Sequence, residues 1–239
     1  MYAPFLGEFL GTTVLILLGG GVVAATLLEK SKAQNAGWIV ITAGWAFAVT
    51  CGIFTAKAFG GPGALNPVGP LADIVLGVGD PQRHLGMIAA EFLGAFCGGV
   101  LVWLHYLPHW KETPDPAAKL AVFGTSPAIR DPLPNLLSEI IGTFVLVFVA
   151  SAIGKATVGA LEPSLIGMVV WAIGLSLGAT TGYAINPARD FGPRLAHALL
   201  PIAGKGRSDW GYAWVPVLGP CLGGVAGAAV FKAIGQIDW

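Results

Sequence analysis

The chain has 239 residues, of which 55% are hydrophobic and only 11% charged, with 13 basic and 13 acidic residues. Its mean hydropathy is +0.74, whereas a soluble domain carries about 25% charged residues. This composition argues against a soluble domain, and the zero net charge without a basic run gives no attraction to nucleic acid.

Six apolar stretches are long enough to cross a bilayer, which takes about 20 residues. The first begins close to Met1 with no basic stretch ahead of it, and it is longer than the apolar core of a cleaved targeting segment. We therefore predict an all-α membrane protein whose first apolar stretch stays in the membrane. The predicted spans are residues 4–28, 36–58, 86–106, 135–154, 161–181 and 212–233.

An Asn-Pro pair, Asn66-Pro67, lies between the second and third spans, and another, Asn186-Pro187, lies between the fifth and sixth. Asparagine is favoured at a helix cap and proline at the first helical position, so each pair predicts the start of a helix with partial positive charge at its N-terminal end. A helix that starts at membrane depth is tolerated only where its backbone is buried in protein or lines a cavity. The two pairs together predict a pore.

Other elements of the first half also recur in the second. Glu8 begins an E-x-x-G-T segment in the first span, and Glu139 begins another in the fourth. Each half therefore holds three spans and one half-helix, and because three is an odd number, the second half enters from the opposite side of the membrane. We predict one channel domain built from two inverted repeats. The boundaries are about 4–106 for repeat one, 107–134 for a proline-rich loop and 135–233 for repeat two.

The midplane of such a pore needs neutral groups that replace the hydrogen bonds of a passing solute. Asn66 and Asn186 supply side-chain amides, which both donate and accept. The positive ends of the half-helices behind them would oppose cations, including hydronium. Arg189 is the charged residue expected in the pore lining, because a charge at membrane depth faces water or the bundle interior. The alternative is a structural ion pair between Arg189 and Asp190.

The second motif, Asn186-Pro187-Ala188-Arg189-Asp190-Phe191-Gly192-Pro193-Arg194, together with the first Asn-Pro pair and the E-x-x-G-T segments, resembles the major intrinsic protein family of aquaporins and glycerol facilitators. The resemblance covers essentially the whole chain. It implies an aquaporin-like right-handed bundle and a homotetramer in which each subunit has its own pore. One departure is Val68, where the family has alanine. Because valine is bulkier and stiff at χ1, we expect the contact between the half-helices to narrow or shift without loss of the pore.

In the resembled family four positions form the narrowest constriction, and spacing from the motifs places them at Trp45, Gly174, Tyr183 and Arg189. Glycerol-conducting members have large aromatics opposite a glycine, whereas strict water channels have a histidine in place of that glycine. Gly174, and Asp190 after the arginine, resemble the glycerol branch. A glycine leaves room, aromatic faces accept the carbon edge of a polyol, and the arginine meets its hydroxyls.

The irregular stretches before the half-helices are expected to turn carbonyl oxygens toward the pore, where permeating hydroxyls become their partners. The resemblance implies that Glu8 and Glu139 accept hydrogen bonds from these loops, and that Asp190 also supports a loop. The minority alternative is that the two glutamates couple transport to protons. The expected pore carbonyls are Gly63, Ala64, Leu65, Tyr183, Ala184 and Ile185, and the midplane motifs are Asn66, Pro67, Val68, Asn186, Pro187 and Ala188.

These features predict a passive channel for glycerol and other small uncharged solutes, with water, that excludes ions and protons. The same fold could conduct mainly dihydroxyacetone, urea, lactic acid, hydrogen peroxide or water, because one methylene changes selectivity by only about 1–3 kcal/mol. An ion- or proton-coupled transporter is an alternative of a different class, since transporters also use inverted repeats and broken helices.

An enzyme is the remaining class of protein, and the sequence gives little support for it. The three cysteines lack a CxxC spacing and the four histidines lack metal-ligand spacing, so no catalytic residue, metal or cofactor is predicted. The expected partners are glycerol, water, the lipid bilayer and further copies of the chain. The expected location is the cell membrane, crossed several times.

Overall fold

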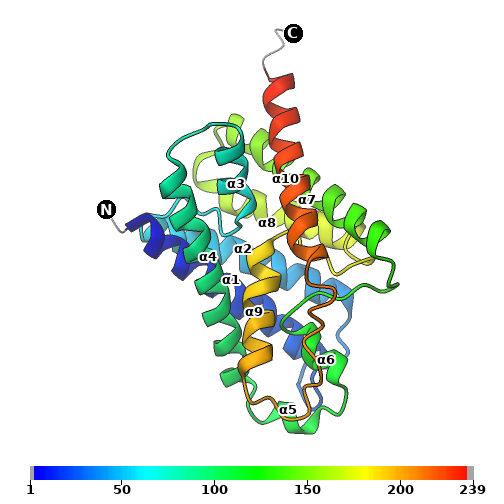
Figure 1. Ribbon diagram of the computed structural model, residues 1–239. Coiled ribbons are helices and arrows are strands. Elements are labelled where there is room, and N and C mark those ends of the chain that lie inside the picture. Colours follow the sequence, from blue (N-terminus) through cyan, green and yellow to red (C-terminus); the bar gives the residue numbers. More distant parts are fainter. Residues whose placement is uncertain (1–2, 236–239) are drawn as a thin grey trace.

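The computed structural model describes residues 3–235, and within that range the regular structure is helical, with no strand (Figure 1). Six segments are long and apolar enough to cross a membrane, which confirms the predicted all-α fold and its six spans. The long helices are α1 (Ala3–Leu27), α2 (Trp38–Ala58), α4 (Pro81–His105), α7 (Pro132–Lys155), α8 (Glu162–Ser176) and α10 (Val215–Ile234); the 3₁₀ helix η1 (Gly159–Leu161) leads into α8.

Two short helices start in the middle of the molecule. Helix α9 (Pro187–Leu199) is capped by Asn186, whose Oδ1 accepts hydrogen bonds from the backbone of the first turn, and α3 (Val68–Val75) starts directly after Pro67. Figure 1 shows α3 in the upper half of the molecule and α9 in the lower half. The Asn-Pro pairs therefore start two half-helices that occupy opposite halves.

The helix packing has the internal symmetry of a repeat. The neighbours α1–α2 and α1–α4 of the first half correspond to α7–α8 and α7–α10 of the second. Each half-helix packs on the last long helix of its own half and on that of the other half, so that both α3 and α9 contact α4 and α10. The two halves are thus interlocked through their half-helices as two inverted repeats.

The largest differences from the predicted spans are at the start of α4 and the end of α8, and the predicted loop also contains helices. Helix α4 begins at Pro81 rather than at residue 86, because Asp80 caps it by accepting a hydrogen bond from Gln82 N at 3.0 Å. Helix α8 ends at Ser176, and the chain from there to the second half-helix is irregular. The proline-rich loop contains two short helices, α5 (His109–Glu112) and α6 (Pro116–Ala121).

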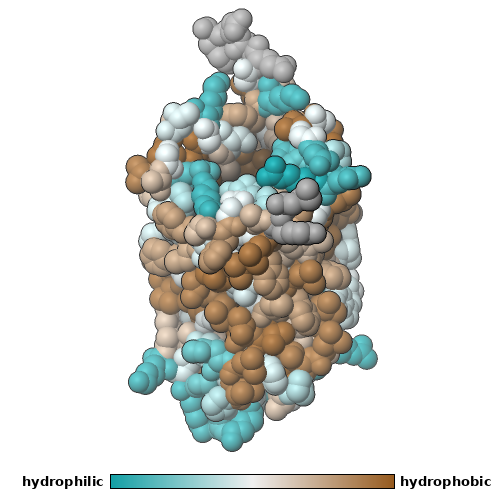
Figure 2. Space-filling view, turned by 90° about the vertical axis from the view of Figure 1, so that its left-hand side faces the viewer, coloured by the Kyte–Doolittle hydropathy of each residue, from teal (hydrophilic) through white to brown (hydrophobic). Residues whose placement is uncertain are grey.

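The outer surface is apolar around its middle. On the face shown in Figure 2, hydrophobic residues form a band between two hydrophilic ends. Large apolar side chains stand exposed on several helices, including Ile39, Phe47, Leu93, Leu133 and Met168, each at least 60% exposed. A continuous exposed apolar surface of this kind suits contact with lipid or with another membrane subunit.

Candidate pore

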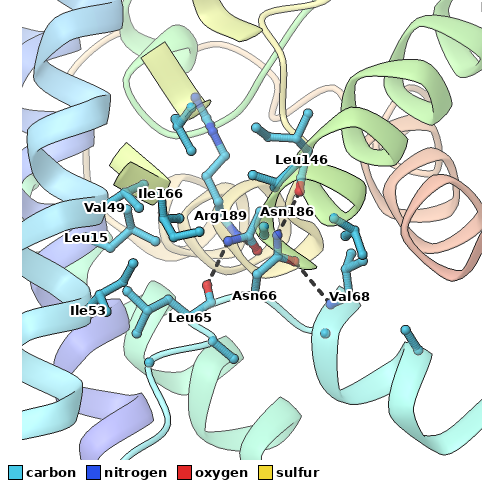
Figure 3. A pocket seen from close by; sticks show the side chains of 18 of the residues that line it. Leu15, Val49, Ile53, Leu65, Asn66, Val68, Leu146, Ile166, Asn186 and Arg189 are labelled. Atoms are coloured by element: carbon cyan, nitrogen blue, oxygen red, sulfur yellow. Dashed lines mark hydrogen bonds between the residues drawn. The ribbon is translucent and has the colours of Figure 1, made fainter. Parts of the chain in front are cut away.

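A cavity of about 410 Å³ lies between the two repeats. Asn66 and Asn186 lie side by side in its wall (Figure 3). One part of the lining is the backbone of the two loops that precede the half-helices. The facing part is apolar and comes from long helices of both repeats; it includes Leu15, Val49, Ile53, Leu146, Ile166 and Val170.

Each of the two asparagines hydrogen-bonds to the loop that carries the other. Asn66 Nδ2 donates to the carbonyl of Ile185 at 2.8 Å, and Asn186 Nδ2 donates to the carbonyl of Leu65 at 2.7 Å (Figure 3). Their Oδ1 atoms accept from the first N–H groups of their own half-helices, at 3.1 Å from Val68 N and 3.0 Å from Ala188 N. An amide nitrogen has two hydrogens, so each asparagine keeps one N–H for a solute.

The loop before α3 is held by Glu8, which is fully buried on α1. Glu8 accepts hydrogen bonds from the backbone N–H groups of Gly63 (2.6 Å), Ala64 (3.2 Å) and Leu65 (2.8 Å). Leu65 adopts φ +53°, the left-handed region that non-glycine residues rarely occupy. The carboxylate thus stabilises a strained backbone whose N–H groups point toward α1.

The loop before α9 is held in the same way by Glu139, which is 1% exposed on α7. Glu139 accepts from Ala184 N at 3.0 Å, from Ile185 N at 2.9 Å and from the hydroxyl of Thr181 at 2.6 Å. Tyr183 and Ile185 have φ +37° and +43°. In both repeats, a buried glutamate therefore stabilises the strained loop by accepting its backbone N–H groups.

All six residues expected to present carbonyls line the cavity. The carbonyls of Leu65 and Ile185 each accept one hydrogen bond from an asparagine amide. Within residues 3–235, the other four carbonyls accept no hydrogen bond from the protein. They belong to Gly63, Ala64, Tyr183 and Ala184. A carbonyl at this depth needs a partner, and a hydroxyl group in the cavity can supply it.

Three of the four residues expected at the constriction line the cavity: Trp45, Tyr183 and Arg189. The Arg189 guanidinium carbon lies 4.2 Å from the centroid of the Trp45 ring, a cation–π arrangement. The guanidinium makes no ion pair with Asp190, so that alternative is wrong; the carboxylate binds Arg194 instead. Arg189 thereby keeps its donors for a solute.

Gly174 lies next to the Tyr183 ring. It is buried but does not line the cavity. A Cβ atom built on it would lie 2.9 Å from Thr42 Cγ2 and 3.0 Å from Tyr183 Cζ. Its missing side chain therefore makes room for the Tyr183 ring, and its expected place at the constriction stays a prediction.

Asp190 supports a loop other than the two at the midplane. Its carboxylate accepts from Thr125 N at 2.6 Å and from the Thr125 hydroxyl at 2.7 Å, and it pairs with Arg194 Nε at 2.7 Å. The segment that Thr125 begins is bonded in turn to the loop after α8, through Ala128 N and the carbonyl of Thr180 at 2.9 Å. Asp190 thus acts on the pore wall through an intermediate loop.

Val68 is fully buried beside the cavity. Its Cγ1 occupies the space that a Cβ on Gly224 of α10 would fill. The larger residue in the first motif is therefore accommodated by a glycine on the neighbouring helix.

Sequence reasoning missed two buried charged residues next to the pore. Arg194 is fully buried and bonded to Asp190, to the carbonyl of Thr125 at 2.7 Å and to that of Ser208 at 2.9 Å. Glu91 is also fully buried, on α4, and accepts from Asn66 N at 3.2 Å. A charge inside an apolar span was the available signal for Glu91.

Comparisons with known proteins agree with this architecture. Residues 1–231 match the Major intrinsic protein family. The chain is 55% identical to Glycerol uptake facilitator protein 3 of Lactiplantibacillus plantarum, over 96% of this chain and 95% of that protein. It is 54% identical to a probable glycerol uptake facilitator protein of Thermotoga maritima, over 95% and 97%. Its structure matches that of the aquaglyceroporin from Plasmodium falciparum with a TM-score of 0.85 and 26% identity, over 98% and 96%. This chain belongs to the major intrinsic protein family.

Proposed function

We propose that this protein is a passive channel of the cell membrane that conducts glycerol and other small uncharged solutes, with water, and excludes ions and protons. The observation that carries the proposal is the two-sided cavity: its apolar wall faces loops in which, within residues 3–235, four carbonyls accept no hydrogen bond from the protein. The related proteins named as glycerol uptake facilitators support the choice of solute. A channel of this family is a transport protein and not an enzyme.

Glycerol matches the two walls of this cavity. It has three hydroxyl groups along one edge and carbon-bound hydrogens along the other. The hydroxyls can donate to the free carbonyls and accept from Arg189, while the carbon edge lies against side chains such as Leu15 and Ile166. Replacement of lost water hydrogen bonds at both loops keeps the barrier to passage low.

The geometry also accounts for the exclusion of protons. One N–H of Asn66 and one of Asn186 remain free for a water molecule at the midplane. A water oxygen that accepts both has its two hydrogens directed away from the asparagines, so it cannot accept a proton from a neighbouring water. The positive ends of α3 and α9 and the charge of Arg189 act against cations in the same region.

Solute flux into proteoliposomes, followed by stopped-flow light scattering, tests this function. We expect fast glycerol flux in the wild type and a strong loss in Gly174→His, because the new side chain displaces the Tyr183 ring into the path. Water flux should persist in both. Gly154→Ala is the control, since a Cβ there meets no atom within 4 Å. Fast water flux without glycerol flux in the wild type would contradict the proposal, and parallel runs with dihydroxyacetone and urea rank the alternative solutes.

The proposed functional form is a homotetramer in a lipid bilayer, with a pore in each subunit. The exposed apolar side chains of the long helices support it, because they offer area for both lipid and subunit contacts. Light scattering of the detergent-purified protein should give a protein mass four times the 24.5 kDa of one chain. A single-chain mass under conditions that retain glycerol flux after reconstitution would contradict the tetramer.

A further inference from the structure

Helix α4 carries a buried carboxyl group that the proposed conduction path does not use. Glu91 is 0% exposed, as is Glu8 on the adjacent helix α1. The two carboxyl groups are neighbours, because Glu8 accepts the backbone N–H of Leu65 at 2.8 Å and Glu91 accepts that of the next residue, Asn66, at 3.2 Å. Within the described residues, no salt bridge involves either glutamate.

The hydrogen bonds around the two glutamates differ. Glu8 accepts three backbone N–H groups, which occupy both of its oxygens, as suits an ionised carboxylate. Glu91 accepts only one, from Asn66 N, and its Oε2 has no hydrogen-bond partner. Two ionised carboxylates side by side, without a cation and away from water, would repel each other strongly. A proton on Glu91 Oε2 removes that repulsion and supplies the missing hydrogen bond.

We propose that Glu91 is a protonated positioning residue, whose acid O–H donates to Glu8 while its other oxygen accepts the backbone N–H of Asn66. The proton on Glu91 then joins two parts of the first pore loop through a hydrogen bond. Glu8 holds the stretch before Asn66, and Glu91 holds Asn66 itself, which precedes α3. The direction of the Asn66 amide depends on this link. Loss of the Glu91 proton places a second negative charge next to Glu8. The resulting repulsion weakens the hold of Glu91 on the backbone N–H of Asn66.

In the second repeat a hydroxyl group, and not a second carboxyl group, donates a hydrogen bond to the glutamate that holds the loop. There the hydroxyl of Thr181 donates to Glu139 at 2.6 Å. The residue that matches Glu91 in the repeat is Pro216, at the start of α10. Sensitivity to alkali is therefore a property of the first loop alone.

Within residues 3–235, no cation forms a salt bridge with Glu91. Among the described residues of the helices packed on α4, Glu8 is the charged residue of α1. Asp73 of α3 and Arg189 of α9 line the cavity, and Asp190 and Arg194 bind one another. His197, the remaining titratable residue of α9, bonds to Ser208.

Glu91→Gln is the decisive variant, because its amide can donate to Glu8 and accept from Asn66 but cannot ionise. Infrared spectra of the reconstituted protein at neutral pH should show a carboxylic acid C=O band that Glu91→Gln lacks. The control is Glu112→Gln on the surface, where the hydrogen bond from Lys30 lowers the pKa of Glu112. That substitution should leave the band unchanged.

Glycerol flux gives a second readout, which rests on the proposed function, whereas the infrared band does not. We expect wild-type flux to fall several-fold at alkaline pH, above the range in which ordinary glutamates ionise, and Glu91→Gln flux to stay constant. An acid band that Glu91→Gln leaves intact would overturn the proposal. A Glu91→Gln flux profile that falls as the wild type does would also overturn it.

Discussion

Replacement of Asp190 by asparagine is expected to lower the free energy of unfolding by about 3–5 kcal/mol, the usual cost of breaking a buried ion pair. Arg194 is fully buried and would keep its charge without the carboxylate that neutralises it. An asparagine keeps only one of the two oxygens, so its NH2 group would face either the Thr125 donors or Arg194 Nε, and those donors would lose their acceptor. Because that loop supports the one before α9, glycerol flux should fall as well.

Thermal unfolding of the detergent-purified protein measures this effect, with Asp209→Asn as the matched control. Asp209 pairs with Arg130 at 2.5 Å, but these side chains are 24% and 54% exposed. A surface pair of this kind contributes about 0–1 kcal/mol. Equal losses of stability in the two variants would contradict the structural role assigned to Asp190.

The second large effect is expected at the contact between α3 and α10. Gly224→Ala would place a methyl group where Val68 Cγ1 lies, so the valine must move. Val147 Cγ2 would lie 3.4 Å from the new atom, and both valines line the cavity, so a displaced Val68 side chain can move into it. Overpacking of this kind costs about 1–3 kcal/mol. We expect glycerol flux in Gly224→Ala to fall about tenfold, equivalent to about 1.4 kcal/mol of barrier, and water flux to fall less.

Val68→Ala in the Gly224→Ala background provides the rescue. The smaller alanine side chain leaves room for the new methyl group at position 224, so glycerol flux in the double variant should return toward the wild-type rate. Gly21→Ala on α1, where an added Cβ meets no atom within 4 Å, should leave flux unchanged. If Gly224→Ala conducts glycerol as fast as the wild type does, Val68 does not border the path.

The site shows where prediction from sequence succeeds and where it stops. Asn66 and Asn186 could be placed at helix starts, because capping depends on adjacent residues. Their crossed bonds to Ile185 and Leu65 could not, since each joins residues from different repeats. Gly174 was expected to open the path directly, but which atoms face a missing side chain depends on the packing of three segments.

Motifs in the sequence carry the resemblance to the major intrinsic protein family, and the residues alone predict the six spans, the two half-helices and the inverted repeat. These properties follow from local composition, from capping and from an odd number of spans. Three pairings became visible only in the folded chain: Asp190 neutralises Arg194 rather than Arg189, Glu91 binds the N–H next to one held by Glu8, and Gly224 accommodates Val68. The physical reason is that such pairings depend on close approach between distant segments, and one residue pattern is compatible with several of them.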